Sequence, residues 1–347
     1  MRKTELSYLN ILFCMLVIFI HIISYPLSGY GLGNLPYNIT LFLWRLSSFV
    51  VQGFVLTAGI KMFLGKEKPY LKMLFSKLKN IILPYAFWYV CYFVFYMIVF
   101  NYPFDILFIL KHFFLGSLAP HTYFVPLIMQ FFILYPLWKL MVKKINPAVA
   151  FILSVIISLC AENILPVVLY NKGIAFMYND RLFTTYLSYW VVGCYIGANY
   201  EGFKALLSKV KLYIPFILIS ALNLYLSYLN YIGIKIITYL NVVHSAYCFI
   251  TILMLFSVFL KTQSFNCRLL KTIDNSSYTI YLCHMLFVFV AEGIFSKLLC
   301  IQSNLLLFIL MAVFTYPLAI FTSHILKRLQ ARWSLFKCLI FSLSEEV

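Results

Sequence analysis

Long apolar stretches alternate with short polar segments along nearly the whole chain. A hydrocarbon core about 30 Å thick needs roughly 20 helical residues to cross it, which is the length of these stretches. We therefore predict an all-α integral membrane protein with a single ten-span domain over residues 1–347, including a short tail at 327–347. The expected spans are 6–27, 40–62, 80–100, 121–141, 147–168, 182–200, 211–230, 236–260, 276–296 and 304–326.

The positions of lysine and arginine give an independent test of this topology, because cytoplasmic segments are enriched in both residues. With a cytoplasmic N-terminus, the inner segments carry 21 of the 27 Lys and Arg residues and the outer segments carry 5, while Arg45 lies inside the second span. An added or lost span would destroy this alternation. The charges therefore predict that both the N- and the C-terminus are cytoplasmic.

Composition excludes several classes of protein. A hydrophobic content of 64% and a mean hydropathy of +0.94 indicate the bilayer as solvent. The net charge of +17 follows the inner segments, so it predicts contact with anionic lipids of the inner leaflet and not with nucleic acid. The nine cysteines form no CxxC pair, so we expect no metal site. The sequence contains no P-loop and few intramembrane acids that could couple transport to an energy source.

Polar side chains recur inside the apolar stretches at helical spacing. On span one, Asn10 and His21 are 11 residues apart, so they share one face and lie about 16 Å apart along the axis. Tyr281 and His284 share a face of span nine, and His244 belongs to a similar series on span eight. Two interpretations fit such a histidine: it bonds a neighbouring helix, or it lies in a wet cavity and takes part in chemistry.

Other candidate residues lie near the predicted outer surface. Arg45 is near the outer end of span two and Gln52 is further in, while His121, Tyr123 and Phe124 open span four. Arg45 either snorkels to the interface or faces a cavity. His121 is either a surface residue or part of the cavity mouth.

A cationic segment precedes span three. Residues 61–79 contain six lysines and one acid. These lysines either act only as a topology signal or attract a phosphate-bearing cytoplasmic ligand. Lys77 and Lys79 are the closest of them to the entry of span three, so they are the candidates for phosphate binding.

Five motifs occur in the order of a known family. They are Asn10 with His21, ILPY at 82–85 after the cationic segment, Tyr123-Phe124 followed by IMQFFIL at 128–134, VVGCYIGANYE at 191–201, and IYLCH at 280–284. With these motifs the whole chain resembles the membrane acyltransferase-3 family, ten-span enzymes that modify surface glycans. Within that family it is most similar to members that accompany poly-N-acetylglucosamine synthesis in Gram-positive bacteria. It departs from the family at Asn10, Tyr123 and the lysine pair, where many members have Arg, Trp and Arg.

The resemblance implies an O-acyltransferase, expected to be an O-acetyltransferase, in a bacterial cell membrane. It would move the acyl group from cytoplasmic acyl-CoA to a hydroxyl of a cell-surface polysaccharide or of its lipid-linked precursor. A glycan synthase is an expected partner, and no metal is required.

The resemblance also implies roles for individual residues. His21 would be the general base for the hydroxyl or a transient acyl carrier, with His284 and Asn10 beside it. Lys77 and Lys79 would bind the donor. The acceptor would meet His121, Tyr123, Phe124 and Arg45, with Tyr281 and Gln52 in support. The alternative function is export of a surface glycan, which needs a wide aromatic-lined tunnel but no acyl-CoA site.

Overall fold

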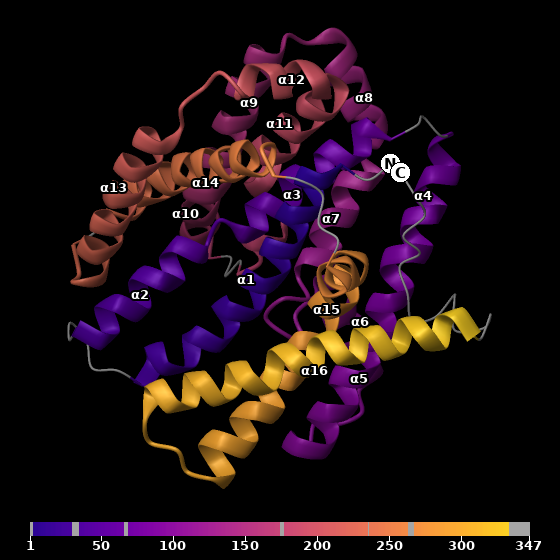
Figure 1. Ribbon diagram of the computed structural model, residues 1–347, viewed down its shortest axis with the longest axis vertical. Helices are drawn as coiled ribbons and strands as arrows, with labels where there is room; N and C mark the ends of the chain where they lie inside the picture. Colours follow the sequence, from indigo (N-terminus) through magenta and orange to yellow (C-terminus); the bar gives the residue numbers. More distant parts are fainter. Residues whose placement is uncertain are drawn as a thin grey trace.

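The computed structural model describes residues 3–29, 35–65, 69–173, 177–234, 236–262 and 267–332, and all of its regular elements are helices (Figure 1). Most of the predicted tail, at 333–347, lies outside the described residues. The α-helices are α1 (Thr4–Gly29), α2 (Leu35–Ser47), α3 (Val50–Leu64), α4 (Tyr70–Lys77), α5 (Leu83–Phe100), α6 (Ile106–Leu115), α7 (Phe124–Ile133), α8 (Tyr135–Lys144), α9 (Pro147–Leu159), α10 (Leu165–Asn171), α11 (Leu187–Ala198), α12 (Tyr200–Leu207), α13 (Tyr213–Tyr231), α14 (Ile237–Phe259), α15 (Arg268–Glu292) and α16 (Asn304–Arg332). Short π-helical turns η1 (Leu78–Ile82), η2 (Cys160–Ile164) and η5 (Gly293–Leu298) continue α4, α9 and α15, and short 3₁₀ turns η3 (Asn179–Arg181) and η4 (Phe183–Tyr186) precede α11.

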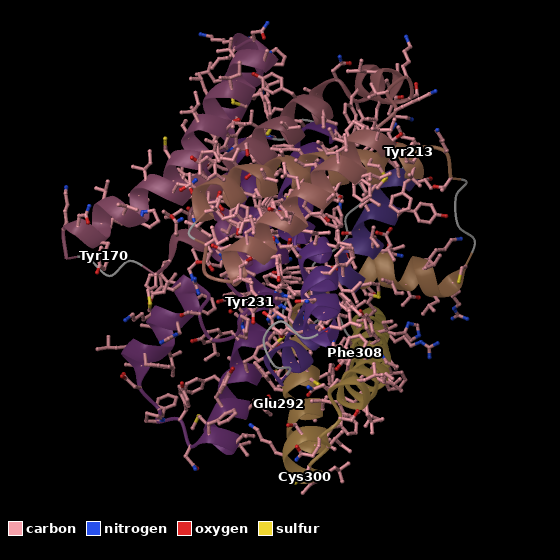
Figure 2. All side chains as sticks on the ribbon, turned by 90° about the vertical axis from the view of Figure 1, so that its left-hand side faces the viewer. Tyr170, Tyr213, Tyr231, Glu292, Cys300 and Phe308 are labelled. Atoms are coloured by element: carbon pink, nitrogen blue, oxygen red, sulfur yellow. The ribbon has the colours of Figure 1, made fainter. Side chains whose placement is uncertain are left out.

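Eight helical segments in the described part of the chain are long and apolar enough to cross a membrane. They coincide with predicted spans one, two, three, five, seven, eight, nine and ten. Large apolar side chains cover the outside of these helices, as expected for surface that faces lipid. Tyr170 and Tyr213, which are 80% and 55% exposed, lie on this surface (Figure 2). The protein is therefore an all-helical, multi-pass membrane protein.

The predicted fourth span is bent. Its two halves, α7 and α8, meet at an angle of 57° around Leu134. Pro136 in the first turn of α8 explains the break, because proline has no N–H and its ring clashes with the preceding turn. The indole of Trp138 donates to the carbonyl of Phe131 across the bend, at 2.8 Å. Counted as one span, this pair raises the number of spans in the described residues to nine.

The predicted sixth span, 182–200, is α11 preceded by short turns. Twelve helical residues extend about 18 Å, which is less than the hydrocarbon thickness. Most residues of α11 are buried, because α3, α8 and α9 surround it. A helix enclosed by other helices can be apolar without being as long as the bilayer is thick. Hydropathy alone therefore predicts a longer helix than α11 is. The total of ten spans thus remains a prediction.

Glycines allow α11 to lie directly against α3. A Cβ atom on Gly193 would come within 2.3 Å of the carbonyl oxygen of Leu56, and one on Gly59 would come within 2.8 Å of the carbonyl oxygen of Trp190. Both obstacles are backbone atoms of the facing helix, which cannot rotate away. Close backbone approach at small residues is the usual way that membrane helices associate.

Several predicted cytoplasmic segments gather at one end of the bundle (Figure 1). Lys3 before α1 pairs with Glu201 of α12 at 2.8 Å, and Lys204 lies 3.7 Å from Glu5 of α1. The hydroxyl of Tyr195, near the end of α11, donates to the carbonyl of Ile145 after α8, at 2.9 Å. These contacts agree with the alternation of lysines and arginines. The side of the membrane on which this end lies remains a prediction.

Candidate functional site

The first and fifteenth helices run side by side and are locked in register. Asn10 of α1 donates through its amide to Asp274 Oδ1 at 2.9 Å and to Ser277 Oγ at 2.8 Å on α15. One turn further along α1, Cys14 Sγ lies 3.5 Å from the carbonyl oxygen of Ser277. Both helices start at the same end of the bundle, so successive turns stay level with one another. This register brings His21 beside His284.

Three histidines meet at that level. The ring of His284 is 5.3 Å from that of His21 and 4.7 Å from that of His121, measured between centroids. The rings of His21 and His121 are 6.4 Å apart. His121 belongs to the turn before α7, so the cluster joins three segments that are far apart in the sequence. We call these three residues the histidine cluster.

Backbone carbonyls orient two of these imidazoles. His284 Nδ1 lies 2.6 Å from the carbonyl oxygen of Tyr281, so it carries the proton and donates, and His121 Nε2 lies 3.3 Å from the carbonyl oxygen of Leu282. Each ring therefore keeps a lone pair on its other nitrogen. Among the described residues, His284 Nε2 and His121 Nδ1 are buried and have no hydrogen-bond partner. Buried lone pairs of this kind are suited to accepting a proton from a substrate.

His21 is the most accessible member of the cluster. His284 is fully buried and His121 is 2% exposed, whereas His21 is partly exposed. A substrate hydroxyl would therefore meet His21 before the other two rings. Although three histidines meet here, no group of His, Cys, Asp and Glu in the described part of the chain is arranged to hold a metal ion.

A tyrosine from α5 supports α15 beside the cluster. The hydroxyl of Tyr92 donates to the carbonyl of Leu282 at 2.8 Å and accepts from the N–H of Leu286 at 3.0 Å. These two backbone groups are the ones that pair within a regular α-helix. The Tyr92 ring also packs against His121, with centroids 5.5 Å apart. Tyr92 therefore positions the segment of α15 that carries His284.

We expect Tyr92→Phe to lower the turnover of the site, because Leu282 and Leu286 lose a shared buried partner and His284 shifts with them. The free energy of unfolding should also fall, by about 1–3 kcal/mol. Tyr89→Phe is the matched control, since its hydroxyl donates to the carbonyl of Ile109 on α6, away from the cluster. Thermal unfolding and turnover of both variants test this. An equal loss of turnover in both would contradict a positioning role for Tyr92.

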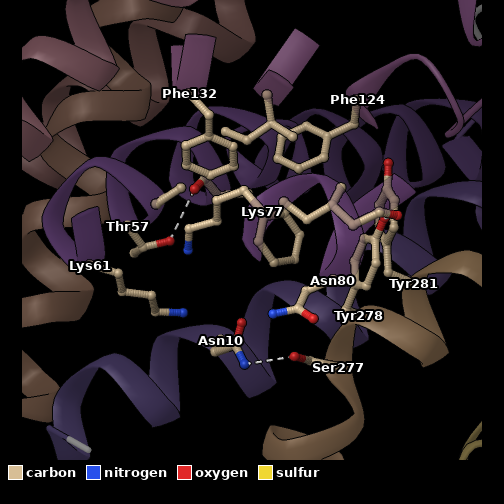
Figure 3. A pocket seen from close by; sticks show the side chains of 14 residues that line it. Asn10, Thr57, Lys61, Lys77, Asn80, Phe124, Phe132, Ser277, Tyr278 and Tyr281 are labelled. Atoms are coloured by element: carbon tan, nitrogen blue, oxygen red, sulfur yellow. Dashed lines mark hydrogen bonds between the residues drawn. The ribbon is translucent and has the colours of Figure 1, made fainter. Parts of the chain in front are cut away.

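A cavity of about 280 Å³ lies between the end of the bundle that carries Lys61 and Lys77, which we call the lysine-rich end, and the histidine cluster. Figure 3 shows the side-chain nitrogens of Lys61, Lys77 and Asn80 pointing into this cavity, with Asn10 and Ser277 beneath them. Two ammonium groups and the amide nitrogen of Asn80 thus converge from α3, α4 and η1, whereas the amide nitrogen of Asn10 donates to Asp274 and Ser277. Such a set of donors favours an anionic ligand, and phosphate in particular.

The other end of the cavity is aromatic. Phe54, Phe124 and Tyr281 line it. The hydroxyl of Tyr281 donates to the carbonyl of His121, and its ring lies 5.3 Å from the ring of His121 and 5.9 Å from that of His284. Tyr281 is therefore in contact with both the cavity and the histidine cluster, and it separates them.

The structure brings together most of the residues predicted for the site. His21, His284 and His121 form the cluster, and Tyr281 lies beside it. Four of the predicted residues line the cavity, namely Asn10, Lys77, Phe124 and Tyr281. Phe124 lines the aromatic end of this cavity, with its ring 5.7 Å from that of Tyr281.

Four predicted residues lie elsewhere. Lys79 does not line the cavity, where Lys61 stands with Lys77 instead. Gln52 faces the turn that precedes α3, where its amide, with nitrogen and oxygen exchanged, donates to the carbonyl of Ser48 at 3.0 Å. Two further residues have partners outside the cluster. Tyr123 stacks under the guanidinium of Arg181 at 5.8 Å, and Arg45 contacts Asn223 at 3.4 Å.

The sequence-based prediction omitted Asp274, Lys61 and Tyr92. Asp274 could have been predicted from helical spacing, because it lies one turn before Ser277 and extends the polar face of span nine. The indication in the sequence is weaker for Lys61, which is a lysine in the last turn of an apolar span. Nothing in the sequence distinguishes Tyr92 from the other tyrosines, of which the chain has 27 in all.

Comparison with known families identifies one match. A family model described as an acyltransferase domain (Acyl_transf_3) matches residues 4–324. No curated protein and no solved structure matches the chain. The matched region starts with α1 and includes every residue of the histidine cluster and of the cavity wall. The chain therefore belongs to the Acyl_transf_3 family of membrane acyltransferases.

Proposed function

We propose that the protein transfers an acyl group, with acetyl as the expected one, from cytoplasmic acyl-CoA to a hydroxyl of a cell-surface polysaccharide or of its lipid-linked precursor. One observation carries this proposal. A cavity that has lysines at one end leads to Tyr281, whose ring touches two histidines of the cluster on its other side. A cationic donor entry and a basic acceptor site thus lie on one line through the bundle.

The donor end suits the phosphates of coenzyme A. Lys61 and Lys77 supply two positive charges, and the amide nitrogen of Asn80 is directed into the same space. The cavity volume is close to the lower limit of about 300 Å³ for small-molecule sites, so it accommodates only part of a donor as large as acyl-CoA. The phosphates would lie at the lysines and the thioester would approach Tyr281.

The histidine cluster supplies the base that a sugar hydroxyl needs. His21 takes the proton of the hydroxyl while its oxygen forms a bond to the thioester carbonyl carbon. The carbon–sulfur bond then breaks and the coenzyme A thiolate leaves, taking up a proton. In the alternative route the His21 imidazole attacks the thioester carbon, the carbon–sulfur bond breaks and the coenzyme A thiolate leaves. The sugar hydroxyl then attacks this acyl-imidazole, its proton passes to the released imidazole or thiolate, and His21 is regenerated. In both routes the rings of His284 and His121 lie beside His21, at 5.3 and 6.4 Å.

Titration calorimetry with acetyl-CoA on the full-length protein in nanodiscs tests the donor half of this proposal. Transfer of labelled acetyl from acetyl-CoA to an N-acetylglucosamine oligomer tests the whole reaction. We expect saturable binding and an O-acetylated product. Absence of acetyl-CoA binding, together with movement of the oligomer across the membrane, would support glycan export instead.

Lys77→Gln should raise the KM for acetyl-CoA by roughly tenfold, because a charge-assisted hydrogen bond to a phosphate contributes about 1.5 kcal/mol or more. The value of kcat should change little, since Lys77 is remote from the histidines. Lys79→Gln is the matched control and should leave KM near that of the original protein, because Lys79 does not line the cavity. Equal KM values for both variants would place the donor phosphates elsewhere.

A further inference from the structure

One wall of the cavity follows a single face of α3. Four residues at the spacing of one helical face line it, namely Phe54, Thr57, Ala58 and Lys61. Along this face the side chains change from a large ring, through two small groups, to a cation. The two small side chains leave the space that forms the middle of the cavity.

α7 supplies a second wall. Phe124, Ile128 and Phe132 lie four residues apart and line the cavity. The Lys77 ammonium stands over the Phe132 ring at 5.1 Å, so Phe132 marks the lysine-rich end. Phe124 lies at the other end, beside Tyr281 (Figure 3). The two ends are seven positions apart on α3 and eight positions apart on α7, which gives a length of roughly 10–12 Å.

Three aromatic rings close the cavity at the end next to the histidine cluster. The ring of Phe54 is 5.9 Å from that of Phe124 and 6.1 Å from that of Tyr281, and the rings of Phe124 and Tyr281 are 5.7 Å apart. All three centroid distances are typical of aromatic rings in contact. We call these three residues the ring triad. A ligand that enters past the lysines therefore meets the ring triad before it meets the histidines.

Neighbouring side chains hold the ring triad in place. Phe13 of α1 is fully buried, and its ring lies 5.5 Å from that of Phe54. The Phe13 ring also fills the space at Gly53, where a Cβ atom would come within 2.5 Å of it. The hydroxyl of Tyr281 is bonded to the carbonyl of His121. Phe54 and Tyr281 therefore cannot withdraw far without displacing a neighbour.

These dimensions limit the acyl group of the proposed donor. The pantetheine arm of coenzyme A, which joins the phosphates to the sulfur, is longer in its extended form than the cavity. With the phosphates at the lysines, the arm would fill the cavity and bring the thioester to the ring triad. Each further methylene of the acyl group would then have to displace a ring. In a tight apolar pocket one methylene changes kcat/KM by roughly 10- to 200-fold.

We propose that Phe54 and Phe124 determine which acyl groups the cavity accepts, and that they restrict them to acetyl and groups of similar size. That this acyl group reaches a glycan rests on the proposed function, whereas the preference of the cavity for a short acyl-CoA does not. The two rings take no part in the chemistry. They act as specificity-determining residues, because they occupy the space that a longer acyl chain needs.

The test compares acetyl-CoA with butyryl-CoA, which has a longer acyl chain, on the full-length protein in nanodiscs. Titration calorimetry measures the affinity for each donor, and transfer to an N-acetylglucosamine oligomer measures kcat/KM. We expect the original protein to prefer acetyl-CoA by about tenfold or more in both measurements. Phe54→Leu and Phe124→Leu should each remove most of this preference, because the smaller side chain leaves room for the longer acyl group.

Phe132→Leu is the matched control, since it makes the same exchange in the wall of the same cavity at the lysine-rich end. It should change the affinities for both donors by the same factor and leave their ratio unaltered. An equal shift of the ratio in all three variants would indicate a general loosening of the cavity and would overturn the proposal. If either Phe54→Leu or Phe124→Leu does not fold, the other variant carries the test.

The outcomes separate this proposal from the proposed function. Equal affinities of the original protein for the two donors would overturn the role of the ring triad and leave acyl transfer intact. A preference for acetyl-CoA that Phe54→Leu and Phe124→Leu relieve, in a protein that transfers nothing to the oligomer, would uphold that role and refute the proposed function. Absence of binding by both donors would refute both.

Discussion

Replacement of His21 by alanine is expected to lower acetyl transfer by about 10²–10⁴-fold, the usual contribution of a general base. His21 is the partly exposed member of the histidine cluster, so no other imidazole replaces it at the substrate. Binding of acetyl-CoA should be retained, because the cavity wall does not include His21. Turnover of purified variants with labelled acetyl-CoA and a glycan oligomer measures this effect.

His324→Ala is the matched control for this experiment. His324 lies near the end of α16, in a groove with Arg268 and Tyr316, and it is not part of the histidine cluster. Its removal should leave transfer unchanged. Normal turnover of His21→Ala would refute the role assigned to His21. Mass spectrometry of the original protein with acetyl-CoA alone distinguishes the two routes, since only the acyl-carrier route leaves an acetyl group on His21.

Gly193→Ala should destabilise the fold by about 3 kcal/mol or more, which is at or above the upper end for overpacking. The new Cβ would lie 2.3 Å from the carbonyl oxygen of Leu56, so α3 and α11 must separate. The cavity should also open, because Lys61 and Phe54 of its wall belong to α3. Thermal unfolding in detergent measures the loss of stability.

Gly293→Ala provides the comparison, because a Cβ atom there meets nothing within 4 Å. Its unfolding temperature should match that of the original protein. Both variants exchange the same residue types within a helix, so helix propensity is not the source of the difference. Similar unfolding temperatures for the two variants would show that α3 and α11 are not in close contact.

The sequence predicted the membrane spans well where a helix is apolar because it faces lipid, since hydropathy then reports the length of the span. Spans such as α13 and α14 are separated by short loops, so their lengths follow from composition. The lengths and bends of α11 and of the α7–α8 pair were harder to predict from the sequence. Burial inside the protein made α11 apolar without making it long, and the bend depends on Pro136, which a simple count of apolar residues ignores.

The candidate site shows the same division. Helical spacing put Asn10 and His21 on one face and at known depths, and counting along span nine did the same for His284. It did not reveal that α1 and α15 are neighbours, since that depends on contacts between distant segments such as Asn10 with Asp274. Spacing also could not choose between Lys77 and Lys79. Two residues apart on a helix, they point in different directions.

The pairing of α1 with α15 has a consequence for biosynthesis. Cys14 and Ser277, which lie together, are separated by 263 positions in the chain. At a synthesis rate of about 5–20 residues per second, α1 waits roughly 13–50 s in the membrane before α15 is made. During this time its polar face, with Asn10 and His21, needs temporary partners, either other helices of the nascent protein or the insertion machinery. A ribosome-bound chain that ends before residue 268 would therefore be inactive however well its first spans are inserted.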